Sequence, residues 1–147
     1  DVKLAALGNP NIPTRVIHRM AAGTGKRVRE TIAGNISTPK TILMKSARDR
    51  DTNVAYNVAC NPNVPREALT ILAERRNIGI LVAVVRNKNT PEEALAKLAR
   101  NNNRNLRLLI AEHENTSRET LEFLLLKAVK EADQKLAETV RLALAKQ

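Results

Sequence analysis

Aromatic residues are almost missing from this chain of 147 residues, which has no tryptophan and only Tyr56 and Phe123 as aromatics. Proteins that bind single strands stack the unpaired bases on aromatic rings, so the composition argues against that class of nucleic-acid binding. Cysteine is equally scarce, because Cys60 stands alone and excludes an internal disulfide or a metal site built from several cysteines. A lone thiol fits a reducing compartment, and we expect a cytoplasmic protein.

Long hydrophobic runs are also lacking. No stretch approaches the roughly 18 uninterrupted apolar residues of a membrane span, and no charged and then apolar signal segment opens the chain, so we expect no membrane partner. The glycines are too scattered for a phosphate-cradling loop, and the carboxylates form no paired motif. We therefore expect a binding protein that is not an enzyme and uses no cofactor.

The candidate chemical side chains are few. His18 and His113 lie far apart and belong to no metal-ligand spacing, so we interpret each as a surface or turn histidine and predict no metal site. Cys60 has no neighbouring base to activate its thiol. We interpret it as a small residue at the end of a helix, and we predict no catalytic residue.

What the chain does contain is an internal repeat of 26 residues. Four prolines recur at this interval: Pro13, Pro39, Pro65 and Pro91. Four asparagines keep the same interval: Asn9, Asn35, Asn61 and Asn87. A period of this length indicates supersecondary units that bury their apolar faces by stacking on one another. The repeat defines five units, residues 2–27, 28–53, 54–79, 80–105 and 106–131, and in the fifth His113 and Ser117 replace the asparagine and the proline.

The apolar residues on each side of the proline predict two helices in each unit. In the third unit, Val54 and Val58 precede Pro65 at the i, i+4 spacing of a helix. Leu69 and Leu72 follow it on one helical face. We expect a short first helix, a turn, a longer second helix and then a polar loop that closes the unit.

The turn between the two helices carries its own signals. Thr90 precedes Pro91 and is followed by Glu93, an order that predicts a capping box with the proline at the first helical position. Thr116 and Glu119 repeat the box. Asparagine tolerates the left-handed conformation, so we expect the repeated asparagines to end the first helix in that way. We interpret them as turn residues that bind nearby backbone, the alternative being a ladder of amides that faces a ligand.

With these features the chain resembles the leucine-rich variant repeats, a branch of the armadillo and HEAT-like α-solenoids. The resemblance covers roughly residues 2–131 and rests on Val54, Ala59 to Pro62, Pro65, Leu69, Leu72 and Ala73. It implies an all-α, right-handed solenoid of about five two-helix repeats, in which the first helix of a unit is short, 3₁₀ or irregular. The chain departs from the family at Ile36, Lys88 and Glu114, which stand where a proline often follows the asparagine.

The last residues break the period. Leu136, Val140 and Leu144 form an i, i+4, i+8 stripe, which predicts one more amphipathic helix. Because the end of a solenoid needs an element with one polar face, we expect residues 132–147 to be the C-terminal capping helix of the same domain as the repeat array in residues 1–131.

The net charge of +10 is large, and it is concentrated toward the N-terminus. The first unit holds five Lys and Arg and no acid, whereas the fifth holds four Lys and Arg and five acids. Two outward columns of the second helices carry repeated cations, and a closing loop adds two more: Arg19, Lys45, Arg48, Lys97 and Arg100, with Arg75 and Arg76. A row of cations suits a polyanion, so we expect these residues to bind an anionic partner, either nucleic-acid backbone or an acidic protein surface.

Three other interpretations remain open. Exposed lysines and arginines also serve solubility alone. Met44, Ile71, Phe123 and Leu126 lie in or beside the same outward columns, which fits a protein interaction module with mixed contacts. Some solenoids of related fold act on damaged DNA, and a DNA-processing enzyme such as a repair glycosylase is a third alternative, carried by fold alone.

Overall fold

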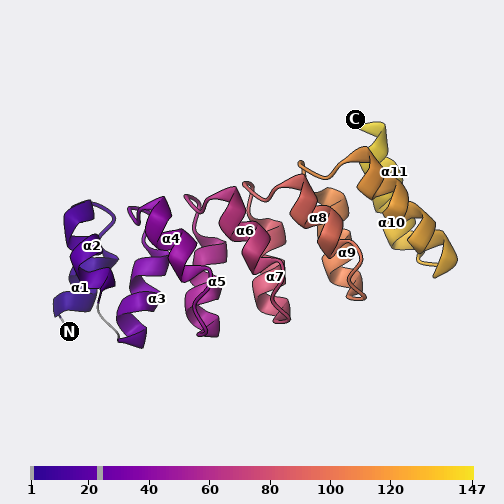
Figure 1. The fold of residues 1–147 in the computed structure, drawn as a ribbon. Coiled ribbons are helices and arrows are strands. Elements are labelled where there is room, and N and C mark those ends of the chain that lie inside the picture. The colour runs from indigo at the N-terminus through magenta and orange to yellow at the C-terminus, as the bar shows by residue number, and fades with distance from the viewer. Residues whose placement is uncertain (1, 23–24) are drawn as a thin grey trace.

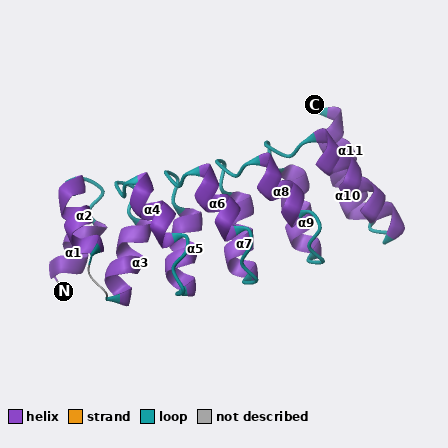
Figure 2. Ribbon diagram, viewed as in Figure 1, coloured by secondary structure: helices purple, strands orange, loops and turns teal. Residues whose placement is uncertain are grey.

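The computed structural model describes residues 2–22 and 25–147, which are all-α (Figure 2). Eleven helices lie in these ranges: α1 (Val2–Gly8), α2 (Thr14–Ala21), α3 (Lys26–Gly34), α4 (Lys40–Ser46), α5 (Thr52–Cys60), α6 (Arg66–Leu72), α7 (Ile78–Arg86), α8 (Glu92–Leu98), α9 (Arg104–Glu112), α10 (Arg118–Lys130) and α11 (Gln134–Ala145). None of the helices in these ranges is long and apolar enough to cross a lipid bilayer.

The helices follow the sequence period. Helices α3, α5, α7 and α9 begin 26 residues apart, and so do α4, α6, α8 and α10. Most helices pack against the next but one: α1 on α3, α3 on α5, α5 on α7, α7 on α9 and α9 on α11, with α4 on α6 and α6 on α8. The result is an elongated helical repeat with the two termini at opposite ends (Figure 1).

A shorter first helix and a longer second helix are found in the first and fifth units, as expected, but the expectation is wrong for the second to fourth. The first helix of the second to fifth units is a regular α-helix of nine residues, and the second helix of the second to fourth units has only seven. The first helices begin early because Asp51, Asn77 and Asn103 are their N-caps, accepting backbone N–H groups in the first turn. These caps lie in the polar loops that the sequence interpretation left outside the helices.

The capping box at Thr90 was also wrong. Pro91 is the N-cap of α8, and the Thr90 hydroxyl instead donates to the carbonyl of Val84 at 2.5 Å, closing the turn back onto α7. Thr116 makes the same bond to Ile110 at 2.6 Å. The position that does cap is Ser117, which accepts the Thr120 N–H, because serine offers an oxygen where proline has none.

The repeated asparagines do not adopt the left-handed conformation. Asn61 has φ −71° and ψ 124°, and His113, in the same column, has φ −78° and ψ 131°. Both are extended, and no described glycine has a positive φ either. The first helix therefore ends in an extended residue and not in a glycine-type cap.

These asparagines join each unit to the one before it. The Asn61 amide donates to the carbonyls of Ala33 and Asn35, both at 2.9 Å, while its Oδ1 accepts the N–H of Asn63 at 2.9 Å. Asn35 and Asn87 repeat the pattern one unit earlier and one unit later. The expected turn role is confirmed, and the amides in addition form a buried ladder between neighbouring units.

The hydrophobic core is aliphatic and divided. Leu43, Leu69, Leu95 and Leu121, one from each second helix, are essentially fully buried and belong to one continuous cluster that runs from Ala33 to the C-terminal helix. A smaller cluster joins the first unit to α3 and α4 of the second: Leu7, Ile12, Ile17, Ile32 and Ile42. The boundary between the two clusters runs through α3 and α4, because Ala33 and Leu43 belong to the larger one.

The C-terminal end is held by α11, which packs against α9 and α10 through Leu136 and Val140. Two ion pairs link α9 to the turn that precedes α11. Arg104 Nε lies 2.6 Å from Asp133, and Arg107 Nη2 lies 2.5 Å from Glu131. Asp133 also caps α11 through the N–H of Leu136.

Candidate binding groove

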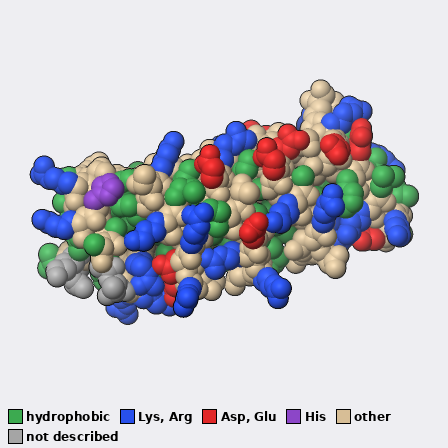
Figure 3. All heavy atoms as spheres, in the orientation of Figure 1, with side chains coloured by type: hydrophobic (Ala, Val, Ile, Leu, Met, Phe, Trp, Pro, Cys, Tyr) green, Lys and Arg blue, Asp and Glu red, His purple; other side chains and the backbone are tan. Residues whose placement is uncertain are grey.

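The expected cations lie on the outside of the second helices. Arg19, Lys45, Arg48, Lys97 and Arg100 are all exposed. On the face drawn in Figure 3, Lys and Arg side chains gather over the N-terminal end of the molecule, whereas most of the visible Asp and Glu lie over its middle and C-terminal parts. The charge asymmetry of the sequence is therefore also a spatial one.

The cations do not form one continuous row. In the third unit, Ile71 and Glu74 occupy the two outward columns that hold cations in other units. Glu74 forms an ion pair with Lys97 of the next unit, with 2.9 Å between Oε1 and Nζ. This contact lowers the pKa of the Glu74 carboxyl through the hydrogen bond from Lys97. Arg100 lies over the ring of Phe123, 5.8 Å from its centroid. Lys97 and Arg100 therefore already have partners, an acid and an aromatic face.

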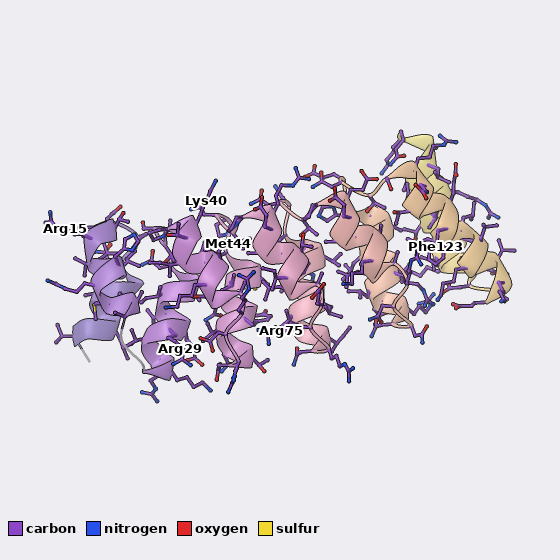
Figure 4. The ribbon with its side chains drawn as sticks, viewed as in Figure 1. Arg15, Arg29, Lys40, Met44, Arg75 and Phe123 are labelled. Carbon is purple, nitrogen blue, oxygen red and sulfur yellow. The ribbon has the colours of Figure 1, made fainter. Side chains whose placement is uncertain are left out.

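Arg75 and Arg76 are adjacent in sequence but differ in burial and in their contacts. Arg75 is half-buried, and its Nη2 donates to the carbonyls of Ala47 at 3.1 Å and Asp49 at 2.5 Å (Figure 4). These bonds join the third unit to the second, as the bonds of Asn61 do at the turn between the two helices. Arg76 is exposed, and no ion pair ties it to the described residues.

The remaining cations meet at a groove of about 810 Å³ between α2 and α4. Its basic lining comes from Lys45 in α4, from Arg48 and Arg50 in the loop that follows, and from Arg29 in α3. His18 of α2 lies on the opposite wall. Most of the remaining lining is aliphatic or hydroxyl-bearing: Ala21, Ala22, Ile32, Ile42, Thr41 and Ser46.

Asp49 is the one carboxylate among the described residues of this lining, and it is paired. Arg29 Nε lies 2.7 Å from its Oδ2 and Arg29 Nη2 lies 3.4 Å from its Oδ1. Desolvation raises the pKa of Asp49, but hydrogen bonds from Arg29 and from the Asp51 N–H outweigh it and hold the pKa below its usual value. With Arg29 and Asp49 paired, the charges of Lys45, Arg48 and Arg50 give the groove a net positive charge.

The repeat pattern predicted only some of the charged residues that line this groove. Lys45 and Arg48 were expected at an interface, whereas Arg29, Arg50 and His18 belong to other columns and were not placed beside them. A signal was present at Ser46, since the other members of its column include Leu72, Leu98 and Leu124. A small polar residue in a leucine column predicts missing volume at that point of the core.

Other chemistry is sparse in the described ranges. No three of their His, Cys, Asp and Glu side chains lie close enough to hold a metal ion. Cys60 is exposed, and its hydrogen bond with Tyr56 raises the pKa of the Tyr56 hydroxyl. Asn35, Asn61 and Asn87 are buried with their amides bonded to backbone, so they offer no ladder to a ligand. Comparison with known protein families, with curated proteins and with solved structures gives no match for this chain.

Proposed function

We propose that this protein is a non-enzymatic binding scaffold for an anionic partner, either nucleic-acid backbone or an acidic protein surface. We further propose a right-handed α-solenoid of about five 26-residue repeats of the leucine-rich variant type, closed by a C-terminal capping helix. The 26-residue register of helices, asparagines and prolines supports the repeat type. The observation that carries the function is the α2–α4 groove, where unpaired cations line a concave surface.

We propose that the partner binds at the groove and not along the full length of the repeat. Lys45, Arg48 and Arg50 are exposed, and none of them forms an ion pair with the described part of the chain. Lys97 and Arg100, which occupy the same columns two units later, already have Glu74 and Phe123 as neighbours. An anion gains more from cations whose charge is unmatched, because no existing pair must be broken first.

A salt titration tests this function. The full chain is titrated into labelled duplex DNA and, separately, into labelled polyglutamate, at salt concentrations from low to above physiological. We expect binding to at least one polyanion that weakens steadily with salt, since each neutralised charge releases a condensed counterion. Absence of binding to both at low salt, or an affinity that salt does not change, would overturn the proposal.

A second function is favoured by an apolar strip on α10. Phe123, Leu126 and Val129 lie three residues apart and are 39%, 74% and 62% exposed. Such a strip fits a protein interaction module that binds by mixed contacts, with Met44 and Ile71 half-buried farther along the rod (Figure 4 labels Met44 and Phe123). A pull-down after nuclease treatment tests it: partners that Leu126→Glu removes support this module, and partners indifferent to that change contradict it.

A further inference from the structure

We infer that the α2–α4 groove binds an acidic peptide segment whose carboxylates flank an aliphatic side chain. This inference rests on the proposed function and names its partner class. It combines three features of the groove: its place at the junction of the first and second units, its apolar floor and its basic rim.

The groove lies where two consecutive second helices touch only sparsely. Helix α4 packs on α6 and α6 on α8, whereas α2 makes its main contacts with α3 and few with α4, as α8 makes few with α10. The smaller core cluster continues beneath this junction, because Ile17 of α2 belongs to the same cluster as Ile32 of α3 and Ile42 of α4. The opening therefore lies at the surface, above the buried contacts that join the first and second units.

Ser46 accounts for the missing volume on the α4 side. Its column holds buried leucines in the third to fifth units: Leu72, Leu98 and Leu124. The serine side chain has two fewer heavy atoms than leucine, so α4 presents a shallow hollow where the later helices present a filled core. The half-buried Ser46 hydroxyl lines the groove, as does the exposed Thr41.

The floor of the groove asks for an aliphatic group. Ile32 and Ile42 are 2% and 9% exposed and line it together with the half-buried Ala21. A leucine or isoleucine from a partner would occupy the space that Ser46 leaves and would bury its own apolar surface against this floor. The Ser46 and Thr41 hydroxyls are suited to hydrogen bonds with the backbone of an extended peptide.

The basic rim of the groove is complementary to carboxylates. Lys45, Arg48 and Arg50 stand beside the floor, and the nearby carboxylate of Asp49 is held by Arg29. A partner with Asp or Glu on each side of its aliphatic residue satisfies rim and floor together. A nucleic-acid duplex satisfies only the rim, because its outer surface carries phosphates and sugars and no aliphatic side chain. The floor therefore favours the acidic peptide over the duplex.

The experiment compares two short labelled peptides of Asp and Glu that differ only at the central residue, which is leucine in one and glycine in the other. Burial of the leucine is expected to strengthen binding to the full chain about tenfold. Ser46→Leu restores the leucine of the later units and fills the hollow without changing the charge. We expect this variant to bind both peptides equally weakly while its thermal unfolding midpoint stays the same or rises.

A matched pair of charge variants locates the rim. Lys45→Glu with Arg48→Glu is expected to weaken the leucine peptide at least tenfold, whereas Lys97→Glu with Arg100→Glu makes the same change in net charge and is expected to weaken it less than threefold. Circular dichroism confirms that each variant is folded. Equal weakening by the two pairs, equal affinity of wild-type protein for the two peptides, or an unchanged leucine advantage in Ser46→Leu would each overturn the inference.

The failure of this inference can be told apart from failure of the proposed function. Salt-dependent binding of duplex DNA without binding of either peptide overturns the peptide inference and leaves the anionic scaffold standing in its nucleic-acid form. Absence of binding to duplex, polyglutamate and both peptides overturns both.

Discussion

His113 Nε2 lies 3.1 Å from the carbonyl oxygen of Asn87, the contact that an asparagine amide makes in the preceding units. The other ring nitrogen, Nδ1, accepts the backbone N–H of Asn115 at 3.0 Å. Because Nδ1 is an acceptor here, the ring proton lies on Nε2 and is donated to Asn87. The imidazole thus does what the asparagine does elsewhere: it donates to the previous unit and accepts from its own turn.

Replacement of His113 by asparagine tests this equivalence. His113→Asn is expected to keep the free energy of unfolding within about 0.5 kcal/mol. His113→Ala is expected to lower it by about 1–2 kcal/mol, because the Asn115 N–H loses its partner and the Asn87 carbonyl keeps only the Thr90 N–H. Urea unfolding at neutral pH measures both. If the alanine variant is as stable as the asparagine variant, the ring contributes no bond of consequence.

Asn61 is the most deeply buried residue of the ladder, at 1% exposure. Asn61→Ala removes three hydrogen bonds and leaves the Ala33 carbonyl and the Asn63 N–H without these bonds, while the Asn35 carbonyl keeps only the Thr38 N–H, so we expect a loss of about 2–4 kcal/mol. Asn61→Asp keeps the size but replaces the donor by an acceptor, and is expected to be at least as destabilising. Exposed Asn63 is the control, since Asn63→Ala is expected to lose no more than about 1 kcal/mol.

Arg107 is a buried cation that is only partly satisfied. It is 4% exposed, and its Nε has no hydrogen-bond partner among the described residues, although its terminal nitrogens bond Asn101 and Glu131. The same column holds buried Leu81 one unit earlier.

We expect Arg107→Leu to leave the free energy of unfolding unchanged or to raise it, because a well-packed aliphatic residue avoids the desolvation of a guanidinium and half-exposed Glu131 can be solvated. Arg107→Ala, which leaves a cavity, is expected to lose about 2–3 kcal/mol. Chemical unfolding of both variants is the measurement, and a Leu variant as unstable as the Ala variant would show that the ion pair outweighs packing.

Acid is expected to destabilise the fold through three aspartates. The pKa of Asp51 is lowered by its hydrogen bond from Lys26, and that of Asp133 by its hydrogen bond from Arg104. At Asp49, hydrogen bonds from Arg29 and the backbone lower the pKa against an opposing effect of desolvation. Since each pKa is lower in the folded chain than the value of about 3.9 in the unfolded chain, the stabilisation is fully present above about pH 5 and is lost as the pH falls through the unfolded and then the folded pKa.

Thermal unfolding between pH 7 and pH 2 measures this loss. We expect a nearly constant midpoint down to about pH 5 and a steep fall below pH 4. Asp133→Asn retains a capping side chain but loses the charge, so it is expected to lower the midpoint at neutral pH and to reduce the acid-induced fall. An identical pH profile in wild type and variant would contradict the role assigned to this ion pair.

The sequence predicted the repeat and its register because burial repeats with the chain. The leucine column of the second helices lies in the core from Ile17 to Leu121, as the spacing required. Helix boundaries were less predictable, because they depend on which local bond a polar side chain selects. Thr90 has the sequence context of a cap, yet its hydroxyl turns back to Val84. An apolar column does not ensure burial at the end of the repeat, since Val2 occupies the same column as buried Val54 and is 87% exposed.

The candidate groove was predictable only in part for a different reason. The columns identify which cations point outward, but not which are neutralised by a nearby carboxylate. Glu74 and Lys97, from neighbouring units, lie 23 residues apart, and Arg29 and Asp49, from the same unit, lie 20 apart, so neither pair follows the 26-residue period. The reach of individual side chains decides these pairs, and the sequence period does not encode it.

The asparagine ladder sets a rule for how the length of such a chain can change. Asn61 and Asn87 each bind carbonyls 26 and 28 residues earlier. If one whole unit were duplicated or deleted, each remaining asparagine amide would still face two carbonyls 26 and 28 residues earlier. If a single residue were inserted between two of these asparagines, the later amide would no longer be in register with its acceptors. The protein can therefore grow or shrink in steps of 26 residues, and the groove beside α4 would keep its shape whatever number of units followed it.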